Sequence, residues 1–249
     1  MDKPKLSIII PAFMEGEDIV PGLIKLSREV HQAKEILVIV DSKDDTTIAP
    51  VELLSNVDKS IRVLVNNFGR GPANAIRFGI SNAQAETILV TMADGCDDPR
   101  QVDELAHLVS RGVMIAAASR YMPGGQQVGG PRVKRVLSRL AGKSFALITG
   151  VGTRDATNSF KAYSKAFVVQ VGIDSRDGFE LGLELTAKAR RLGLPVAEIP
   201  TTWIDRSFGK SNFQLAKWIP KYLSWYLFGI GLPHPNSAIR KAIKKRESK

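Results

Sequence analysis

The sequence predicts an α/β fold with a mostly parallel sheet and helices on both faces. Short runs rich in Val and Ile, with few polar interruptions, are typical of parallel strands that are covered on both sides. Segments with helical apolar spacing lie between these runs, and strands that alternate with helices indicate an α/β sheet. We expect strands over Leu6–Ile10, Ile36–Val40, Ile61–Val65, Thr87–Thr91 and Val113–Ala118, and a short late strand over Pro195–Ile199.

The segments between the strands have the pattern of amphipathic helices. We expect helices over Glu17–Ala33, Ala73–Ala83, Arg100–Ser110 and Glu180–Leu192. Apolar residues recur near one face of the first of these, as packing against a sheet requires. The middle of the chain is less regular. Glycines and prolines between residues 123 and 131 indicate a flexible loop, and a basic segment from Arg132 to Lys143 follows it.

The composition limits the class of protein. A chain of 249 residues suits one large domain or two fused halves. A formal charge of +10 indicates an anionic partner, which is nucleic acid, a phosphorylated small molecule or an acidic membrane surface. The single cysteine, Cys96, forms no intramolecular disulfide and favours a reducing compartment. The apolar runs Leu6–Pro11 and Tyr222–Leu232 are too short for a signal peptide and a membrane span, so we expect a cytoplasmic protein.

Polar residues follow each of the first five expected strands. Ligands of open α/β sheets bind at the carboxyl ends of the strands, so these residues are candidates for a site. They are, strand by strand, Glu15; Asp41, Asp44 and Asp45; Asn66, Asn67, Gly69 and Gly71; Asp94, Asp97 and Asp98; and Arg120.

The carboxylates after the fourth strand suit a divalent cation. Mg²⁺ and Mn²⁺ prefer oxygen ligands, and one or two carboxylates that hold the ion against a diphosphate are sufficient. We predict Asp94 as the main ligand, with help from Asp97. Asp98 is equally suited to cap the helix that begins near Pro99.

The loops after the second and third strands suit a nucleotide. Asp41 can accept hydrogen bonds from a base or ribose, although a turn residue is a serious alternative. Gly69 and Gly71 allow the backbone to approach a ligand. The segment is not G-x-G-x-x-G, because Asn74 stands at the last glycine position, and no G-x-x-x-x-G-K-[ST] sequence occurs. A dinucleotide dehydrogenase and a Walker-type NTPase are therefore disfavoured.

Taken in order, these segments resemble family 2 glycosyltransferases with the GT-A fold, and among them the dolichol-phosphate mannose synthases and related polyprenyl-phosphate glycosyltransferases. The resemblance covers roughly residues 5 to 212. The matched residues are Pro11 and Glu15 in SIIIPAFMEGEDI; Asp41 in VIVDSKDDTT; Arg120 in SRYMPGG; Asp155, Thr157 and Phe160 in DATNSFKAY, which resembles Asp-x-Thr-Ser-Gly-Phe-Arg; and Glu198, Pro200, Asp205, Arg206, Gly209 and Ser211 in EIPTTWIDRSFGKS. The usual Asp-x-Asp metal motif is altered, with Ala93 and Gly95 on either side of Asp94.

The resemblance implies a single inverting transfer from a GDP- or UDP-sugar to a polyprenyl phosphate, with Mg²⁺ or Mn²⁺. It implies a GT-A domain over residues 1–212, with a donor half to about 120, and a separate C-terminal segment over 213–249. The implied catalytic residues are Asp94, Arg120, Asp155 and Arg206. The implied donor site comprises Pro11, Ala12, Glu15, Asp41, Asn67, Gly71 and Asp94. The implied acceptor-phosphate site comprises Arg120, Arg135, Ser138, Arg139, Arg206 and Lys210.

Other functions stay open. A glycosyltransferase that acts on a saccharide hydroxyl would need a base such as Asp155, which is otherwise a turn or cap between a strand and a helix. A non-catalytic sugar-nucleotide-binding protein is compatible with the altered metal motif. A nucleic-acid-binding protein and a nucleotidyltransferase are disfavoured, the first by the carboxylates and the second by DRSFGKS. We expect Glu180 and Glu184 to lie on a solvent-exposed helix face.

The C-terminal segment suggests attachment to the cytoplasmic face of a membrane. Tyr222–Ile230 is almost wholly apolar, and Trp218, Tyr222, Trp225 and Tyr226 suit an interfacial depth. The basic residues that follow attract anionic lipid. The alternative is a helix that packs on the core or on a second copy of the chain. The basic residues are Arg240, Lys241, Lys244, Lys245, Arg246 and Lys249.

Overall fold

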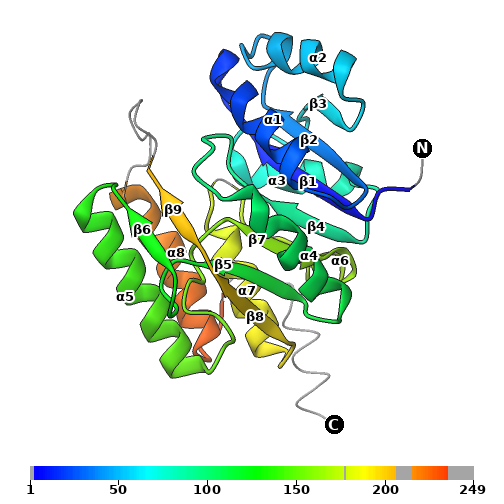
Figure 1. Cartoon of the computed structure of the whole chain (residues 1–249). Helices are drawn as coiled ribbons and strands as arrows, with labels where there is room; N and C mark the ends of the chain where they lie inside the picture. Colours follow the sequence, from blue (N-terminus) through cyan, green and yellow to red (C-terminus); the bar gives the residue numbers. More distant parts are fainter. Residues whose placement is uncertain (1–2, 177, 206–214, 235–249) are drawn as a thin grey trace.

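The structure is a computed structural model that describes residues 3–176, 178–205 and 215–234. For Lys134 and residues 215–218 it describes the backbone alone. Its centre is a seven-stranded sheet in the order β3-β2-β1-β4-β7-β5-β8 (Figure 1). The strands are β1 (Leu6–Pro11), β2 (Lys34–Val40), β3 (Ile61–Val65), β4 (Thr87–Val90), β5 (Ile115–Ser119), β7 (Lys161–Ser164) and β8 (Val196–Pro200). The predicted α/β class and all six predicted strands are confirmed. The sequence did not reveal β7.

Helices cover both faces of the sheet because its buried strands alternate their side chains between two cores. In β1, Ile8 and Ile10 join one core and Ile9 the other. The first core is closed by α1 (Ile19–Glu29), α2 (Ile48–Val57) and α4 (Val102–Ser110), with short 3₁₀ turns at Gly16–Asp18 and Pro99–Gln101. The second core is closed by α3 (Pro72–Asn82), α6 (Lys165–Val171), α7 (Leu181–Arg191) and α8 (Leu215–Gly229).

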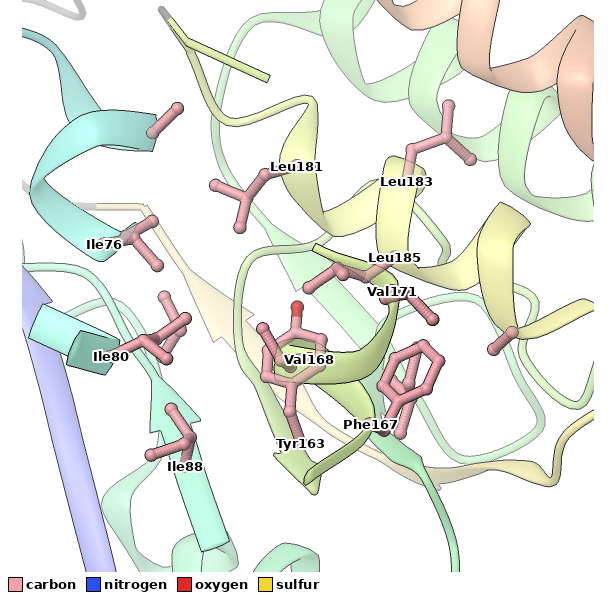
Figure 2. Close-up of a cluster of buried hydrophobic side chains, with 14 of the residues drawn as sticks. Ile76, Ile80, Ile88, Tyr163, Phe167, Val168, Val171, Leu181, Leu183 and Leu185 are labelled. Carbon is pink, nitrogen blue, oxygen red and sulfur yellow. The ribbon is translucent and has the colours of Figure 1, made fainter. Parts of the chain in front are cut away.

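The second core explains why one sequence prediction is wrong. Leu181 and Leu185 lie on the side of α7 that faces Tyr163, whereas Leu183 points to the other side of the helix (Figure 2). Helix α7 is covered on its other side by α8, so its polar residues are buried too. Glu180 and Glu184 are 3% and 0% exposed, not solvated as expected. Glu184 is tolerated in the interior because it pairs with Lys188 at 2.5 Å.

The middle of the chain is more ordered than its composition indicated. The expected loop contains β6 (Gln126–Val128), which pairs in parallel with β9 (Thr202–Ile204) as a second small sheet. The basic segment lies within α5 (Arg132–Thr149), which runs beside α8 (Figure 1). Glycine permits two of the close approaches here. A Cβ at Gly142 would stand 2.2 Å from the carbonyl oxygen of Arg154, and one at Gly152 would stand 1.8 Å from that of Val196.

Strand β7 runs antiparallel to its neighbours β4 and β5. Its first residue therefore lies at the edge of the sheet where the parallel strands end. The segment before β7, which contains Asp155, is brought to that same edge. Asp155 thus follows α5 and precedes a strand, whereas the sequence predicted a strand-to-helix connection. This reversal brings Asp155 beside the residues that follow β5.

The C-terminal helix packs on the core. Trp225 and Phe228 are each 3% exposed, and Tyr222 and Tyr226 pack against the same cluster. His234 stacks on Trp225 with the ring centroids 3.8 Å apart. The expected interfacial placement of Tyr222, Trp225 and Tyr226 is therefore wrong, because α7 and α5 supply a closer apolar surface. The Trp218 side chain and the basic residues after 234 lie outside the described part of the chain.

Candidate active site

The turn after β1 is held by the loop after β2. Met14 has a positive φ of 55°, a conformation that is unfavourable for any residue other than glycine. Its backbone N–H donates to both carboxylate oxygens of Asp45, at 3.1 and 3.2 Å. The next N–H, of Glu15, donates to the hydroxyl of Thr47 at 3.0 Å. Asp45 and Thr47 are buried, so this clasp fixes the edge that Ala12 and Glu15 were predicted to present to a donor.

Asp41 at the end of β2 organises the glycine loop. One carboxylate oxygen accepts from the Asn66 amide at 2.9 Å, and the other accepts from the backbone N–H of Gly71 at 2.7 Å. Gly71 has a φ of 104°, which a glycine adopts without strain. Asp41 therefore serves at least as the turn residue that the sequence allowed. Asn67 is exposed beside it, while the buried Asn66 makes the connection.

The carboxylates after β4 have three different surroundings. Asp94 accepts from the N–H of Cys96 at 3.0 Å. Asp97 is turned inward and accepts from the hydroxyl of Thr91 at 2.7 Å. Burial, helped by the charge of Asp94 and opposed by the hydrogen bond from Thr91, raises the pKa of the Asp97 carboxyl to about 6. Asp98 caps the following 3₁₀ turn and pairs with Arg100, as the capping alternative predicted.

A buried ion pair joins the end of β5 to the segment before β7. Arg120 Nε lies 2.7 Å from Asp155 Oδ2, and Nη2 lies 2.9 Å from Oδ1. The Asp155 side chain is 0% exposed and that of Arg120 only 12%. Burial alone lowers the pKa of Arg120, but the pairing with Asp155 outweighs it and holds that pKa above its ordinary value. Arg120 therefore stays charged.

The pair faces α5 through two hydroxyls. Arg120 Nη2 lies 3.3 Å from Ser138 Oγ, and Ser138 Oγ lies 2.8 Å from Thr157 Oγ1. Beyond them opens a cavity of about 1230 Å³ between α5, the loop after β5 and the segment before Asp155. The predicted residues Arg120, Arg135 and Arg139 all line this cavity.

The cavity is strongly cationic. Besides the three predicted arginines it is lined by Lys143 and Arg154, and its lining contains one carboxylate, that of Glu198. Arg154 pairs with Glu198 at 2.7 Å, as Arg120 pairs with Asp155. In the described part of the chain no ion pair engages Arg135, Arg139 or Lys143. These three follow one another at intervals of four residues on one face of α5, so their charge faces an open volume.

Sequence reasoning missed Thr47, which holds the turn at Glu15, and Arg154, which lines the cavity. The structure also gives contacts to residues that the sequence had already named. Asp45 and Asn66 hold the loops predicted to bind the donor, and Glu198 binds both the side chain and the backbone N–H of Arg154. A polar residue after a strand was the available signal for Thr47. Pro11 and Ala12, two predicted donor-site residues, are buried at the end of β1. Arg206 and Lys210 lie outside the described residues.

The carboxylates after β4 are compatible with binding of a divalent ion. In the described ranges no group of three or more His, Cys, Asp or Glu is arranged to hold a metal. Asp94 and Asp97 are nevertheless close enough for the charge of one to raise the pKa of the other. Two such carboxylates fit an ion that completes its shell with phosphate oxygens and water.

Comparisons with known proteins agree with this architecture. A 29% identical relative over 85% of both chains is a polyprenol monophosphomannose synthase of Mycolicibacterium smegmatis. A 27% identical relative, over 82% of this chain and 85% of its own, is an undecaprenyl-phosphate mannosyltransferase of Micrococcus luteus. Among solved structures, glucosyl-3-phosphoglycerate synthase of Mycobacterium tuberculosis with Mn²⁺, UDP and glucosyl-3-phosphoglycerate superposes with a TM-score of 0.67 at 16% identity, over 93% of this chain and 82% of that one.

The fold of that structure is the GT-A fold, which the sequence predicted and the sheet described above shares. The model of the family described as glycosyl transferase family 2 matches residues 7–172, from β1 to the end of α6. This range contains the loops predicted to bind the donor, the carboxylates after β4 and the Arg120–Asp155 pair. The chain is therefore a glycosyltransferase and belongs to glycosyl transferase family 2.

Proposed function

We propose that the protein transfers a sugar from a nucleoside diphosphate donor to a polyprenyl phosphate. The observation that carries the proposal is the cavity beside the buried Arg120–Asp155 pair. Along one wall lie Arg135, Arg139 and Lys143, which form no ion pair with any described residue. A phosphomonoester carries a charge of about −1.5 to −2 near neutral pH and is stabilised by cations in such a cavity. Both curated relatives have names that specify a polyprenyl or undecaprenyl phosphate product or substrate.

The donor binds at the other end of the same edge. Asp41 and the turn at Glu15 offer hydrogen-bonding groups to a nucleoside, and Gly71 lets the backbone approach it. The carboxylates after β4 come next along the sheet. Mannose is the sugar that the names of both relatives contain, and UDP occupies the solved structure of lower identity. We propose a donor half to about residue 120 and an acceptor half from there to about 212.

A divalent ion, Mg²⁺ or Mn²⁺, held by Asp94 and Asp97, would neutralise the charge that develops on the departing nucleoside diphosphate. Arg120 is near both places, because it lines the cavity and its charge acts on the carboxyl of Asp97. A phosphate in the cavity and a diphosphate at Asp94 would thus meet beside one fixed guanidinium. This arrangement supports direct displacement, in which one phosphate leaves as another attacks.

The displacement needs no strong base when the nucleophile is a phosphate oxygen. The oxygen attacks the anomeric carbon from the face opposite the leaving group, the bond to the diphosphate breaks, and the configuration inverts. Asp155, the base that a saccharide hydroxyl would require, already accepts three hydrogen bonds from Arg120 and is fully buried. This saturation favours a phosphate acceptor over the hydroxyl alternative.

A membrane surface fits the outer side of α5. Residues spaced three, four and seven apart form an exposed apolar stripe that lies beside the cationic face of the helix. The stripe comprises Val133, Val136, Leu137, Leu140, Leu147 and Ile148, and Ile219 and Leu223 of α8 are exposed nearby. No helix in the described ranges is long and apolar enough to cross a membrane. We propose that the protein rests on the cytoplasmic face of a membrane through this stripe, where the acceptor lipid resides.

A matched acceptor screen tests the function. The purified full chain is incubated with Mn²⁺ and each of GDP-mannose, UDP-glucose and UDP-N-acetylglucosamine, with either polyprenyl phosphate or an oligosaccharide. Product masses are recorded. We expect a glycosylated lipid phosphate from one donor and no glycosylated oligosaccharide. Transfer to the oligosaccharide alone would establish the hydroxyl alternative, and donor binding without any transfer would indicate a binding protein.

A further inference from the structure

A lysine is buried directly beneath the turn that carries Asp155. Lys161, the first residue of β7, is 0% exposed. Its Nζ donates to the carbonyl oxygen of Ala156 at 2.9 Å and to that of Asn158. Gly182 of α7 closes the far side, where a Cβ would stand 3.3 Å from the Nζ. None of the ion pairs formed within the described residues includes Lys161.

Such a lysine is a poor choice for stability alone. Burying an ammonium group without a carboxylate partner costs free energy, and an apolar side chain would fill the same volume without that cost. Burial, opposed by the charge of Asp155 and helped by that of Arg120, lowers the pKa of Lys161 to about 7. Because burial of Lys161 costs free energy, its presence here indicates a functional role.

The turn above Lys161 determines where the Asp155 carboxylate points. The N–H of Asp155 donates to the hydroxyl of Thr153 at 3.1 Å, and the Asn158 amide donates to the carbonyl of Ala118 at 2.8 Å. Lys161 adds the two contacts that hold the centre of the turn. Asp155 in turn accepts from Arg120 at three points, so movement of the turn would move the guanidinium at the cavity.

We propose that Lys161 is a positioning residue for the acceptor phosphate. It ties the carbonyls of Ala156 and Asn158 together and so holds Asp155 in the orientation that directs Arg120 toward the cavity. The inference rests on the proposed function for the identity of the acceptor. The pattern that DATNSFKAY resembles ends in Arg where this chain has Lys161, so arginine is the natural conservative replacement.

Three variants of the full chain test the role. Lys161→Met removes the charge and both donors at similar length, and Lys161→Arg restores donors. Lys165→Met is the matched control, because Lys165 donates to the carbonyl of Ala83 at 2.6 Å from just beyond the opposite end of the same strand. Amide hydrogen exchange of residues 155–160 and of Arg120 is measured for each. The KM values for polyprenyl phosphate and for the donor are measured in parallel.

We expect Lys161→Met to speed exchange in 155–160 and to raise the acceptor KM about tenfold, with the donor KM unchanged, as a misplaced group would. Lys161→Arg should restore most of the slow exchange and most of the low acceptor KM, and Lys165→Met should match the wild type in both measurements. Wild-type exchange and acceptor KM in Lys161→Met would overturn the inference. If that variant does not fold, Gly182→Ala, which crowds the Nζ, should raise the acceptor KM in the same way, and an unchanged KM there would overturn it.

The two proposals fail separately. If the wild-type protein transfers no sugar to polyprenyl phosphate, the proposed function is wrong. The exchange measurement needs no transfer, and it still decides whether Lys161 holds the turn and the backbone N–H of Arg120.

Discussion

Arg120 and Asp155 form a bidentate pair, with Nε–Oδ2 and Nη2–Oδ1 distances of 2.7 and 2.9 Å, and the backbone N–H of Arg120 donates to the same carboxylate at 3.0 Å. The two residues are 35 positions apart and meet because β7 runs against its neighbours. A carboxylate bound in this way orients a guanidinium rather than removing a proton. The pair is thus better suited to hold a phosphate than to activate a hydroxyl.

The first prediction concerns this pair and the free energy of unfolding. Arg120→Met leaves the Asp155 carboxylate buried without its partner, which should cost about 3 to 5 kcal/mol. The double variant Arg120→Met/Asp155→Leu removes both charges and should recover most of that loss, while transfer stays abolished. Urea unfolding and transfer assays on the wild type, both single variants and the double variant form a complete cycle. A double variant as unstable as the sum of the singles would show that the pair is not coupled.

The second prediction concerns the pH dependence of stability at Asp97. Burial raises the pKa of this carboxyl from 3.8 to about 6 in the folded protein. The folded state then holds the proton more tightly, so this contribution to stability is full below pH 3.8 and is lost as the pH rises through 6. A shift of two units corresponds to about 3 kcal/mol. Asp97→Asn keeps an acceptor for Thr91 but has no proton to lose. Without metal, its free energy of unfolding should therefore rise relative to that of the wild type, by up to about 3 kcal/mol, between pH 4 and 7.

Urea unfolding of both proteins at several pH values in chelator measures the difference. Asp98→Asn is the control, because hydrogen bonding from Arg100 lowers the pKa of Asp98 and its contribution is instead lost as the pH falls. An Asp97→Asn curve parallel to that of the wild type would show that Asp97 titrates normally.

The sequence predicted β1, β2, β4 and β5 well because these inner strands are buried on both faces. The run ILVIV from Ile36 to Val40 is 0% exposed throughout, and such a run forms no amphipathic helix. Strand β7 was missed because KAYS is short and polar at both ends, and only its place between β4 and β5 buries it. Glu184 was misjudged for a related reason, since α8 covers its side of α7 and its ion-pair partner, Lys188, lies within the same helix.

The sequence could place a candidate site residue only where that residue directly follows a predicted strand. Asp94, Arg120 and Asp41 follow their strands, and parallel strands end at one edge. The contact between Arg120 and Asp155 depends on the direction of β7, which no local pattern encodes. The cationic face of α5 had a visible spacing of four residues from Arg135 to Lys143, but a loop was the expected neighbour and the cavity was not foreseen.

The third prediction concerns the metal. Asp94→Ala should lower the Mn²⁺-dependent affinity for the nucleoside diphosphate by at least about tenfold, because even outer-shell partners of a metal have effects of that size. Asp98→Ala is the matched control, since Asp98 follows the same strand but caps the next turn and pairs with Arg100. Calorimetry with GDP and UDP, with Mn²⁺ or chelator, measures both. Mn²⁺-dependent binding that survives intact in Asp94→Ala would remove this residue from the metal site.

The fourth prediction concerns the apolar stripe of α5. Leu140 and Leu147 are 62% and 87% exposed, and burying each in lipid is worth about 1.5 kcal/mol or more. The double variant Leu140→Glu/Leu147→Glu should therefore lower membrane partition by about two orders of magnitude. Flotation with vesicles of phosphatidylcholine and phosphatidylglycerol at moderate salt measures this. Leu53→Glu, at a 70% exposed leucine of α2, is the control and should float as the wild type does. Equal flotation of all three proteins would exclude the stripe as the contact.

The last prediction separates a phosphate acceptor from a hydroxyl acceptor. Arg135 and Arg139 face the cavity without a carboxylate partner in the described part of the chain, so an acceptor phosphate is the group they would bind. Loss of one charge-assisted contact costs about 1.5 to 3 kcal/mol, which is a rise of tenfold to a hundredfold in the acceptor KM.

Arg135→Ala and Arg139→Ala should each show this rise with the donor KM unchanged, and the effect should shrink as added salt screens the charges. Arg28→Ala, at an exposed arginine of α1 outside the cavity, should leave both KM values unchanged. A hydroxyl acceptor predicts the reverse: small effects at both arginines, an almost inactive Asp155→Asn variant, and a rate that climbs with pH as a base loses its proton. Initial rates of all four variants with polyprenyl phosphate and with an oligosaccharide, across pH 6 to 9, decide between the two acceptors.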